Sequence, residues 1–145
     1  MDNLITKADL ILKNGEDLSK LVNDLELYNS DDWKEFIYYS KDYYKKNLAR
    51  KTDTISIYII CWNKDQYSKI HNHPDKGCAV KMLKGSIKEE CYKFENDNLT
   101  YIKSKELKEG LVNYNSGSVY VHKMIPLEDS ISLHIYPNDY KMKVY

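Results

Sequence analysis

The sequence predicts a single domain with an all-β core, an antiparallel barrel preceded by a short α-helical region. At 145 residues the chain has the length of one domain. Apolar residues recur at helical spacing over about residues 1–43, whereas over about residues 44–145 they form short runs rich in β-branched residues. Turn residues separate these runs at intervals of about eight to twelve residues, which is typical of a β-sandwich or barrel. We therefore expect a helical cap on a β-barrel, in one domain spanning residues 1–145.

The helical region contains apolar stripes that each predict one helix. The first stripe consists of Leu4, Ile5, Ala8, Ile11 and Leu12. The second consists of Leu18, Leu21, Val22 and Leu25. Asn14-Gly15 ends the first helix, because glycine readily adopts the left-handed conformation of a helix cap. Ser30 can cap a third, shorter helix in which Trp33 and Ile37 face inward.

The remainder of the chain contains a series of predicted strands. The densest run is Ile55–Trp62, whose β-branched residues predict a central strand. The other predicted strands are Cys78–Leu83, Ser86–Tyr92, Leu99–Lys103, Leu111–Tyr114, Ser118–His122 and Ile131–Tyr136. Turns are predicted at Gly85, Asn96-Asp97-Asn98, Gly110, Ser116-Gly117 and Pro126–Asp129.

Charge, hydropathy and cysteine usage argue against several classes of function. Lys+Arg and Asp+Glu number 22 each, and a net charge near zero argues against nucleic acid as a partner. The longest apolar stretch, Ile55–Trp62, is far too short to span a bilayer, and no secretory leader opens the chain. The three cysteines, Cys61, Cys78 and Cys91, suit a reducing compartment better than a disulfide framework. We expect a cytoplasmic monomer without nucleic-acid or membrane partners.

The four histidines are the first candidates for chemistry. His71 and His73 stand two residues apart, so on a strand both imidazoles point to the same face and can share a metal ion. His122 and His134 fall in later strand-like runs, which allows every histidine to lie inside one barrel. Each signal also has an ordinary explanation, since a His-x-His pair occurs by chance and a histidine at a strand end is usually structural. Cys78 by itself is most often a small buried hydrophobe.

The run Ser130–Tyr136 alternates between a polar and an apolar face. The polar face holds Ser130, Ser132, His134 and Tyr136, and the apolar face holds Ile131, Leu133 and Ile135. If the polar face turns into the barrel, its members need one another as hydrogen-bond partners, because buried polar groups must be satisfied. If it faces water, the run is an ordinary half-exposed strand, which is the more common arrangement. The run alone leaves both arrangements open.

The combination of these residues is more specific than any one of them. A first motif consists of His71-x-His73, Cys78, Lys81-Met82-Leu83-x-Gly85 and Lys88-Glu89. A second consists of His122-Lys123 and Ser132-Leu133-His134-x-Tyr136-Pro137, and upstream stand Tyr44-x-Lys46-Asn47-Leu48 and Ile60-Cys61-Trp62. In these motifs, over about residues 28–140, the chain resembles the thiol dioxygenases of the cupin superfamily, in particular cysteine dioxygenase. The resemblance implies a cupin fold, a jelly-roll β-barrel.

The resemblance also implies an Fe(II) cofactor and a role for each site residue. The implied metal ligands are His71, His73 and His122. The implied catalytic residues are Tyr136, His134, Ser132 and Cys78, of which Cys78 and Tyr136 face each other and can form a thioether cross-link. The implied substrate-binding residues are Lys46, Tyr44 and Tyr136, with Trp62 packed beside the site. The implied reaction belongs to cysteine metabolism, the oxidation of L-cysteine by O2 to cysteine sulfinic acid.

Three neutral imidazoles suit an anionic sulfur ligand. They leave the full 2+ charge on Fe(II), whereas a carboxylate ligand would cancel part of it. Many cupins have a metal-binding glutamate at the position of Cys78, and its replacement by cysteine is a feature of the cysteine dioxygenase branch. Metal binding also lowers the pKa of a coordinated thiol. The ligand set implied by the resemblance therefore agrees with a thiol substrate.

Lys46 departs from the family pattern, in which an arginine holds the substrate carboxylate. Lysine offers a point charge on a flexible stem and fixes a carboxylate less firmly, while the strand register argues against Arg50 as a substitute. The alternatives are therefore a dioxygenase for another small thiol, such as 3-mercaptopropionate or cysteamine, a non-catalytic metal- or ligand-binding cupin, and a degenerate barrel kept for protein contacts. The chain ends at Tyr145, before the C-terminal extension of longer family members, so we expect a more open active site.

Overall fold

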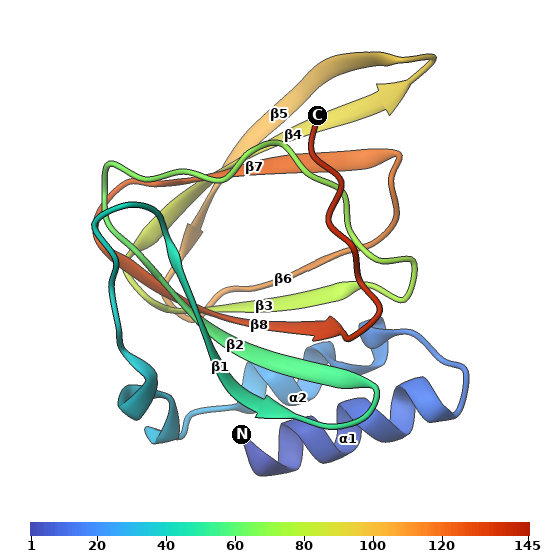
Figure 1. The fold of residues 1–145 in the computed structure, drawn as a ribbon, viewed down its shortest axis with the longest axis vertical. Coiled ribbons are helices and arrows are strands. Elements are labelled where there is room, and N and C mark those ends of the chain that lie inside the picture. Colours follow the sequence, from blue (N-terminus) through green and yellow to red (C-terminus); the bar gives the residue numbers. More distant parts are fainter.

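The computed structural model describes residues 1–145 and consists of two facing β-sheets with helices on one side (Figure 1). The five-stranded sheet has the order β1-β2-β8-β3-β6 and the three-stranded sheet the order β5-β4-β7. The strands are β1 (Lys45–Lys51), β2 (Ile55–Trp62), β3 (Cys78–Lys84), β4 (Ser86–Glu95), β5 (Asn98–Lys108), β6 (Val112–Asn115), β7 (Tyr120–Pro126) and β8 (Ser130–Pro137). The predicted class, a β core behind a helical N-terminal region, is confirmed.

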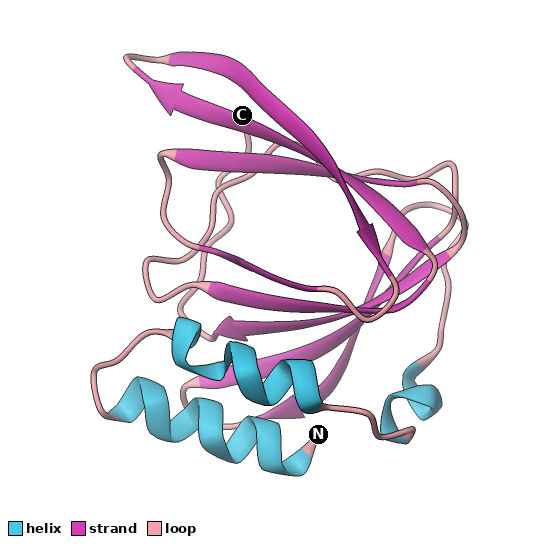
Figure 2. Cartoon of the chain, turned by 180° about the vertical axis from the view of Figure 1, so that it is seen from behind, coloured by secondary structure: helices cyan, strands magenta, loops and turns pink.

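The helical region covers the outer face of the five-stranded sheet (Figure 2). It comprises α1 (Asp2–Lys13), a 3-10 turn (Leu18–Leu21), α2 (Val22–Leu27) and a second 3-10 turn (Asp32–Phe36). The chain leaves α1 through Gly15, whose φ of +76° favours glycine. Ile37 is 37% exposed instead of facing inward as predicted, because the last turn ends at Phe36 and Phe36 packs against the core. No helix has both the length and the apolar character needed to cross a membrane.

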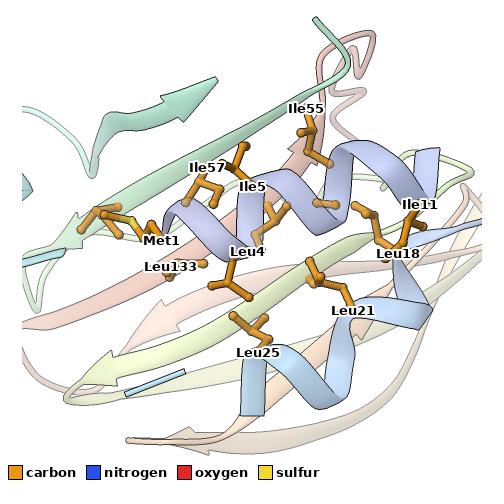
Figure 3. Close-up of a cluster of buried hydrophobic side chains, with 14 of the residues drawn as sticks. Met1, Leu4, Ile5, Ile11, Leu18, Leu21, Leu25, Ile55, Ile57 and Leu133 are labelled. Atoms are coloured by element: carbon orange, nitrogen blue, oxygen red, sulfur yellow. The ribbon is translucent and has the colours of Figure 1, made fainter. Parts of the chain in front are cut away.

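Most of the hydrophobic core lies between the helices and the five-stranded sheet (Figure 3). This cluster holds 16 buried residues, in which Leu4 and Ile5 of α1 and Leu25 of α2 meet Ile57 and Leu133 of the sheet. The cluster between the two sheets holds only six buried residues. The space between the sheets is therefore available to polar side chains.

Lys81 connects the helical layer to strand β3. Its Nζ donates hydrogen bonds to the backbone carbonyls of Leu25 and Glu26, each at 3.0 Å, and to that of Tyr28. These carbonyls belong to the C-terminal end of α2, where helical carbonyls lack intrahelical partners and the helix dipole is negative. The buried ammonium group thus satisfies the end of α2 and fixes it against the sheet.

Strand β8 is buried on both of its faces. Ile131, Leu133 and Ile135 pack beneath the helices and are at most 1% exposed. Ser132 and His134, on the opposite face, are 0% and 5% exposed. The polar face therefore turns into the space between the sheets, and the more common arrangement, in which it faces water, is excluded.

Several strands differ in extent from their prediction. Strand β1 was not among the predicted runs, because its sequence does not alternate, and it is held as an edge strand by pairing with β2. Strand β5 continues beyond its predicted end at Lys103, because β4 pairs with it along its whole length. Strand β7 begins at Tyr120 and runs to Pro126, so His122 lies inside the strand and not at its end.

Candidate metal centre

Three histidine side chains converge between the two sheets. His122 lies in β7, whereas His71 and His73 lie in the segment between β2 and β3. The Nε2 atom of His122 is 2.9 Å from Nε2 of His73 and 3.1 Å from Nε2 of His71. All three residues are buried, with no more than 8% of their surface exposed. Their ligand atoms lie close enough together to hold one metal ion.

The backbone around His71 and His73 differs from the regular strand that was predicted. His71 forms isolated antiparallel bridges with His122 and with Val144, and in the bridge with His122 each N–H donates to the other carbonyl, at 2.9 and 3.2 Å. The N–H of His73 donates to the carbonyl of Gly117 at 2.9 Å. The two rings of the pair nevertheless face the same space, with centroids 5.5 Å apart. The expectation of a shared face holds without a continuous strand.

The hydrogen bonds of Nδ1 in His71 and in His122 show which ring nitrogen carries a proton. Nδ1 of His71 lies 2.8 Å from the carbonyl oxygen of Lys69, and Nδ1 of His122 lies 2.6 Å from a carboxylate oxygen of Glu89. Both partners can only accept, so both Nδ1 atoms carry hydrogen, and a ring that holds this one proton keeps a bare lone pair at Nε2. Two bare nitrogen lone pairs at 3.1 Å cannot hydrogen-bond to each other. A cation bound between them satisfies both, so these residues fit a metal ion.

Electrostatics and spacing support the same assignment. Burial and the neighbouring His122 ring lower the pKa of His71 to about 3 and that of His73 to about 2. Both rings are therefore neutral at physiological pH, which is the form that binds metal. The Nε2 separations of 2.9 and 3.1 Å are short enough for the rings to hold one ion between them.

Glu89 is a residue of the site that was predicted only as part of a motif, without a role. It lies in β4, is 1% exposed, and accepts hydrogen bonds from His122 Nδ1 at 2.6 Å and from Asn113 Nδ2 at 2.8 Å. Burial opposes its ionisation, but the hydrogen bonds and charges around it, led by the hydrogen bond from His122, together outweigh burial and lower the pKa of Glu89. Strand alternation could have revealed it, because Glu89 shares a face with the fully buried Ile87.

A hydrogen-bonded row crosses the inner face of β8. Trp62 Nε1 donates to Ser132 Oγ at 2.9 Å, and Ser132 Oγ lies 2.8 Å from His134 Nε2. His134 Nδ1 lies 2.8 Å from the Tyr136 hydroxyl oxygen. If Ser132 donates to Nε2, then Nδ1–H donates to Tyr136 and the phenolic hydrogen is free to point elsewhere. Burial lowers the pKa of His134 well below its ordinary value, so its ring is neutral.

Cys78 and Lys46 lie beside Tyr136. Burial raises the pKa of the Cys78 thiol to about 12, although the adjacent Tyr136 hydroxyl and the Lys46 charge act in the opposite direction. Nζ of Lys46 lies 5.5 Å from the centroid of the Tyr136 ring. Lys46 is exposed as a whole residue but also lines the cavity, and desolvation there lowers the pKa of Lys46. Tyr44 stacks on Trp62 with ring centroids 4.4 Å apart.

The C-terminal segment forms a further part of the wall. Met142 lines the same cavity, and the ring of Tyr140 stacks on Tyr136 at 5.3 Å between centroids. The Tyr140 hydroxyl donates to the carbonyl of Asn72 at 2.6 Å, between the two histidines of the pair. Sequence reasoning missed Tyr140 and Met142, because they follow the last strand and no periodic pattern places them.

One cavity collects nearly all of the predicted site residues. Its lining includes Tyr44, Lys46, Trp62, His71, His73, Cys78, His122, His134 and Tyr136. Ser132 lies behind His134 as its hydrogen-bond partner. A larger and more open hollow beside α1, near Lys7 and Asp24, lacks a convergent set of metal ligands. We therefore take the cavity with the three histidines as the candidate site, although the hollow beside α1 is larger.

Sequence comparison relates the chain to one family. Residues 4–143 match the family model described as Cysteine dioxygenase type I. Cysteine dioxygenase type 1 of Bos taurus is 29% identical over 147 residues, covering 90% of this chain and 74% of that protein. The Danio rerio protein of the same name is 26% identical over 145 residues, with coverages of 93% and 72%. The Homo sapiens protein is 26% identical over 121 residues, covering 77% of this chain and only 60% of its own length.

Structural comparison relates the fold to cupins. A protein with a double-stranded beta-helix domain from Klebsiella pneumoniae superposes with a TM-score of 0.58 at 14% identity, covering 77% of this chain and 86% of that one. A cupin-2 domain containing protein from Shewanella frigidimarina superposes with a TM-score of 0.55 at 13% identity, covering 79% and 98%. At such identities the likeness concerns the fold alone. The predicted cupin jelly-roll fold is confirmed.

Proposed function

Because the chain belongs to the cysteine dioxygenase type I family, we propose that it is an Fe(II)-dependent thiol dioxygenase. The favoured substrate is L-cysteine, whose thiol gains both atoms of O2 to give cysteine sulfinic acid. The observation that carries the proposal is the convergence of His71, His73 and His122 beside the Tyr136 hydroxyl and the Cys78 thiol. The cavity has a free volume of about 20 Å³, so its own side chains nearly fill it and only a small ligand can be accommodated.

The proposal gives the three histidines the task of holding the metal. Fe(II) bound there supplies redox chemistry toward O2 and lowers the pKa of a coordinated thiol. Nδ1–H of His71 and of His122 each donate to a fixed acceptor, Lys69 O and a Glu89 oxygen, so both rings are held in the orientation that a ligand needs.

Tyr136 is proposed to present a proton at the cavity. The row that begins at Trp62 and passes through Ser132 and His134 occupies the acceptor side of its hydroxyl. Its O–H then points toward Cys78 and the cavity. There it can donate a hydrogen bond to the substrate carboxylate or to an O2-derived oxygen atom that is transferred to the sulfur. Burial raises the pKa of Tyr136 well above its ordinary value, so the phenol keeps this proton at physiological pH.

Lys46 is proposed to bind the substrate carboxylate. No aspartate or glutamate lines the cavity, and Lys46 supplies its positive charge near Tyr136. We expect Lys46→Met to lower kcat/KM for cysteine by about tenfold, which corresponds to ~1.4 kcal/mol, while oxidation of cysteamine, which lacks a carboxylate, changes little. Oxygen consumption with both thiols measures the difference.

Lys45→Met is the matched control for this experiment. Lys45 precedes Lys46 in β1 and is exposed, but it does not line the cavity around the three histidines. We expect its substitution to leave both activities unchanged. An equal loss with cysteine and with cysteamine in Lys46→Met would remove Lys46 from carboxylate binding.

Cys78 and Tyr136 are proposed to form a thioether cross-link. We expect the purified protein to run as two bands on a denaturing gel. The cross-linked form should be lighter by about two hydrogen atoms, because coupling of thiol and phenol transfers two electrons and two protons to an oxidant, here O2. Cys78→Ser should leave one band of full mass, because it removes the sulfur that joins the ring. Two bands in Cys78→Ser would disprove this pairing.

The proposed reaction is tested directly by anaerobic reconstitution with ferrous iron. A panel of cysteine, 3-mercaptopropionate and cysteamine is then mixed with O2, and products are identified by mass. We expect an increase of two oxygen atoms on cysteine and uptake of one O2 per thiol consumed. Tight metal binding without oxygen uptake for any thiol would instead identify a non-catalytic metal-binding cupin.

A further inference from the structure

Glu89 is a buried carboxylate one hydrogen bond away from the metal centre. Strands β4 and β7 are paired with Glu89 opposite Met124 and Cys91 opposite His122, so Glu89 and His122 are diagonal neighbours on one face. The carboxylate oxygen lies 2.6 Å from Nδ1 of His122, and Glu89 is 1% exposed. We propose that Glu89 is a positioning residue that fixes His122 as a ligand and places a carboxylate next to the metal centre. This inference rests on the proposed metal centre.

The rest of the site holds Glu89 in one orientation. Asn113 Nδ2 of β6 donates to the same oxygen at 2.8 Å, and Asn115 Nδ2 lies 3.5 Å from it. Nζ of Lys105 in β5 lies 3.6 Å from the other oxygen and donates to Asn113 Oδ1 at 2.9 Å. The Cys91 thiol donates to this second carboxylate oxygen at 3.4 Å. Both carboxylate oxygens are therefore engaged, and β4, β5 and β6 all contribute to the cluster. A glutamate that only filled space would not need partners on both oxygens.

The carboxylate changes the charge expected at the site. Three neutral imidazoles alone would leave the full 2+ charge of Fe(II) in the cavity. The Glu89 carboxylate acts on the metal through His122 without occupying a position on the metal, and Lys105 beside it offsets part of its charge. It also makes the His122 ring a stronger donor to the metal, because Nδ1–H is shared with an anion. This arrangement supplies negative charge while leaving metal positions open to thiol and O2.

Glu89→Gln tests the inference, because it keeps the shape and removes the charge. We expect the dissociation constant for Co(II), measured in metal-free protein by competition with a chelator, to rise about 10- to 100-fold. We also expect the Fe(III)/Fe(II) reduction potential to rise, since the lost negative charge had favoured Fe(III). A purely structural role would lower the unfolding temperature of the metal-free protein but leave the potential unchanged.

Two further variants keep the test decisive. Glu90→Gln is the matched control, because Glu90 lies next in β4 but contacts Lys88 and Tyr92 rather than His122, and we expect wild-type affinity and potential. Lys105→Met changes a half-exposed side chain and should fold even if Glu89→Gln does not. We expect it to shift affinity and potential, because the carboxylate loses its cationic partner.

The outcomes separate this inference from the proposed function. Co(II) affinity within about twofold of wild type in Glu89→Gln, with an unchanged potential, would overturn the role of Glu89 while leaving the dioxygenase proposal intact. Should Glu89→Gln fail to fold, wild-type affinity and potential in Lys105→Met would overturn it. Failure of the wild-type protein to bind either metal would overturn the metal centre itself, and this inference with it.

Discussion

Replacing His73 by alanine is expected to abolish thiol-dependent oxygen consumption and to weaken Fe(II) binding by more than about 100-fold. That figure is the upper range for losing only an outer hydrogen-bond partner of a ligand, and His73→Ala removes the ligand itself. Fe(II) content after reconstitution and oxygen uptake with cysteine measure the two effects. Iron content and turnover like those of the wild-type protein would contradict the assignment of His73.

His73 is the best of the three histidines for this experiment. Its Nδ1 is buried without a hydrogen bond of normal geometry, so its removal leaves no partner unsatisfied. Removing His71 or His122 would leave the Lys69 carbonyl or the Glu89 carboxylate without its donor, which adds a folding cost. Asp75→Ala serves as the control, because Asp75 is exposed in the same segment and should retain both iron and activity.

Replacing Leu133 by alanine is expected to destabilise the fold by about 3 kcal/mol while leaving the metal centre unchanged. Leu133 is 0% exposed in the cluster between the sheet and the helices, and a buried leucine truncated to alanine costs about 2–5 kcal/mol. For a domain of this size the unfolding temperature should fall by roughly 10 °C. Thermal unfolding followed by circular dichroism measures the stability, and Co(II) titration of the folded protein measures the site.

Leu10→Ala is the control for the stability experiment. Leu10 lies on α1 and is 55% exposed, so its truncation removes little buried surface and we expect a change within about 0.5 kcal/mol. A loss below about 1 kcal/mol in Leu133→Ala would show that the helical layer contributes little to stability. A loss of Co(II) binding in Leu133→Ala would show that the two faces of β8 are not independent.

Periodicity was enough to predict the elements with the strongest apolar patterns. The predicted strand Ile55–Trp62 has the bounds of β2, and the apolar stripe of α1 is buried as expected. Strand β1 escaped prediction because it is an edge strand, whose polar sequence acquires its conformation from pairing with β2. Periodicity left two arrangements open for the run Ser130–Tyr136, because alternation alone does not show whether the polar face meets water or the interior.

The candidate site was predicted in part, from the family resemblance and not from periodicity. The resemblance selected residues that lie around one cavity, although their roles stay predictions. Spacing gave the pair His71 and His73, but nothing local in the sequence joins them to His122. The partners of Glu89 could not be predicted from the sequence, because Lys105 and Asn113 lie near Glu89 only as a result of the pairing of separate strands. Such contacts depend on strand register, which no short motif encodes.

The two-sided burial of β8 has a consequence for how this protein can diversify. Its hydrocarbon side meets the helices, and its hydroxyl, imidazole and phenol side meets the cavity. Apolar residues of β8 beneath the helices can therefore be exchanged for others of similar volume without changing the polar side chains on its opposite face. Substitutions at Lys46 or Met142, which line the cavity and are exposed, are expected to cost little folding free energy. One face of β8 thus contributes to the stability of the fold, and the opposite face contributes the polar groups of the cavity.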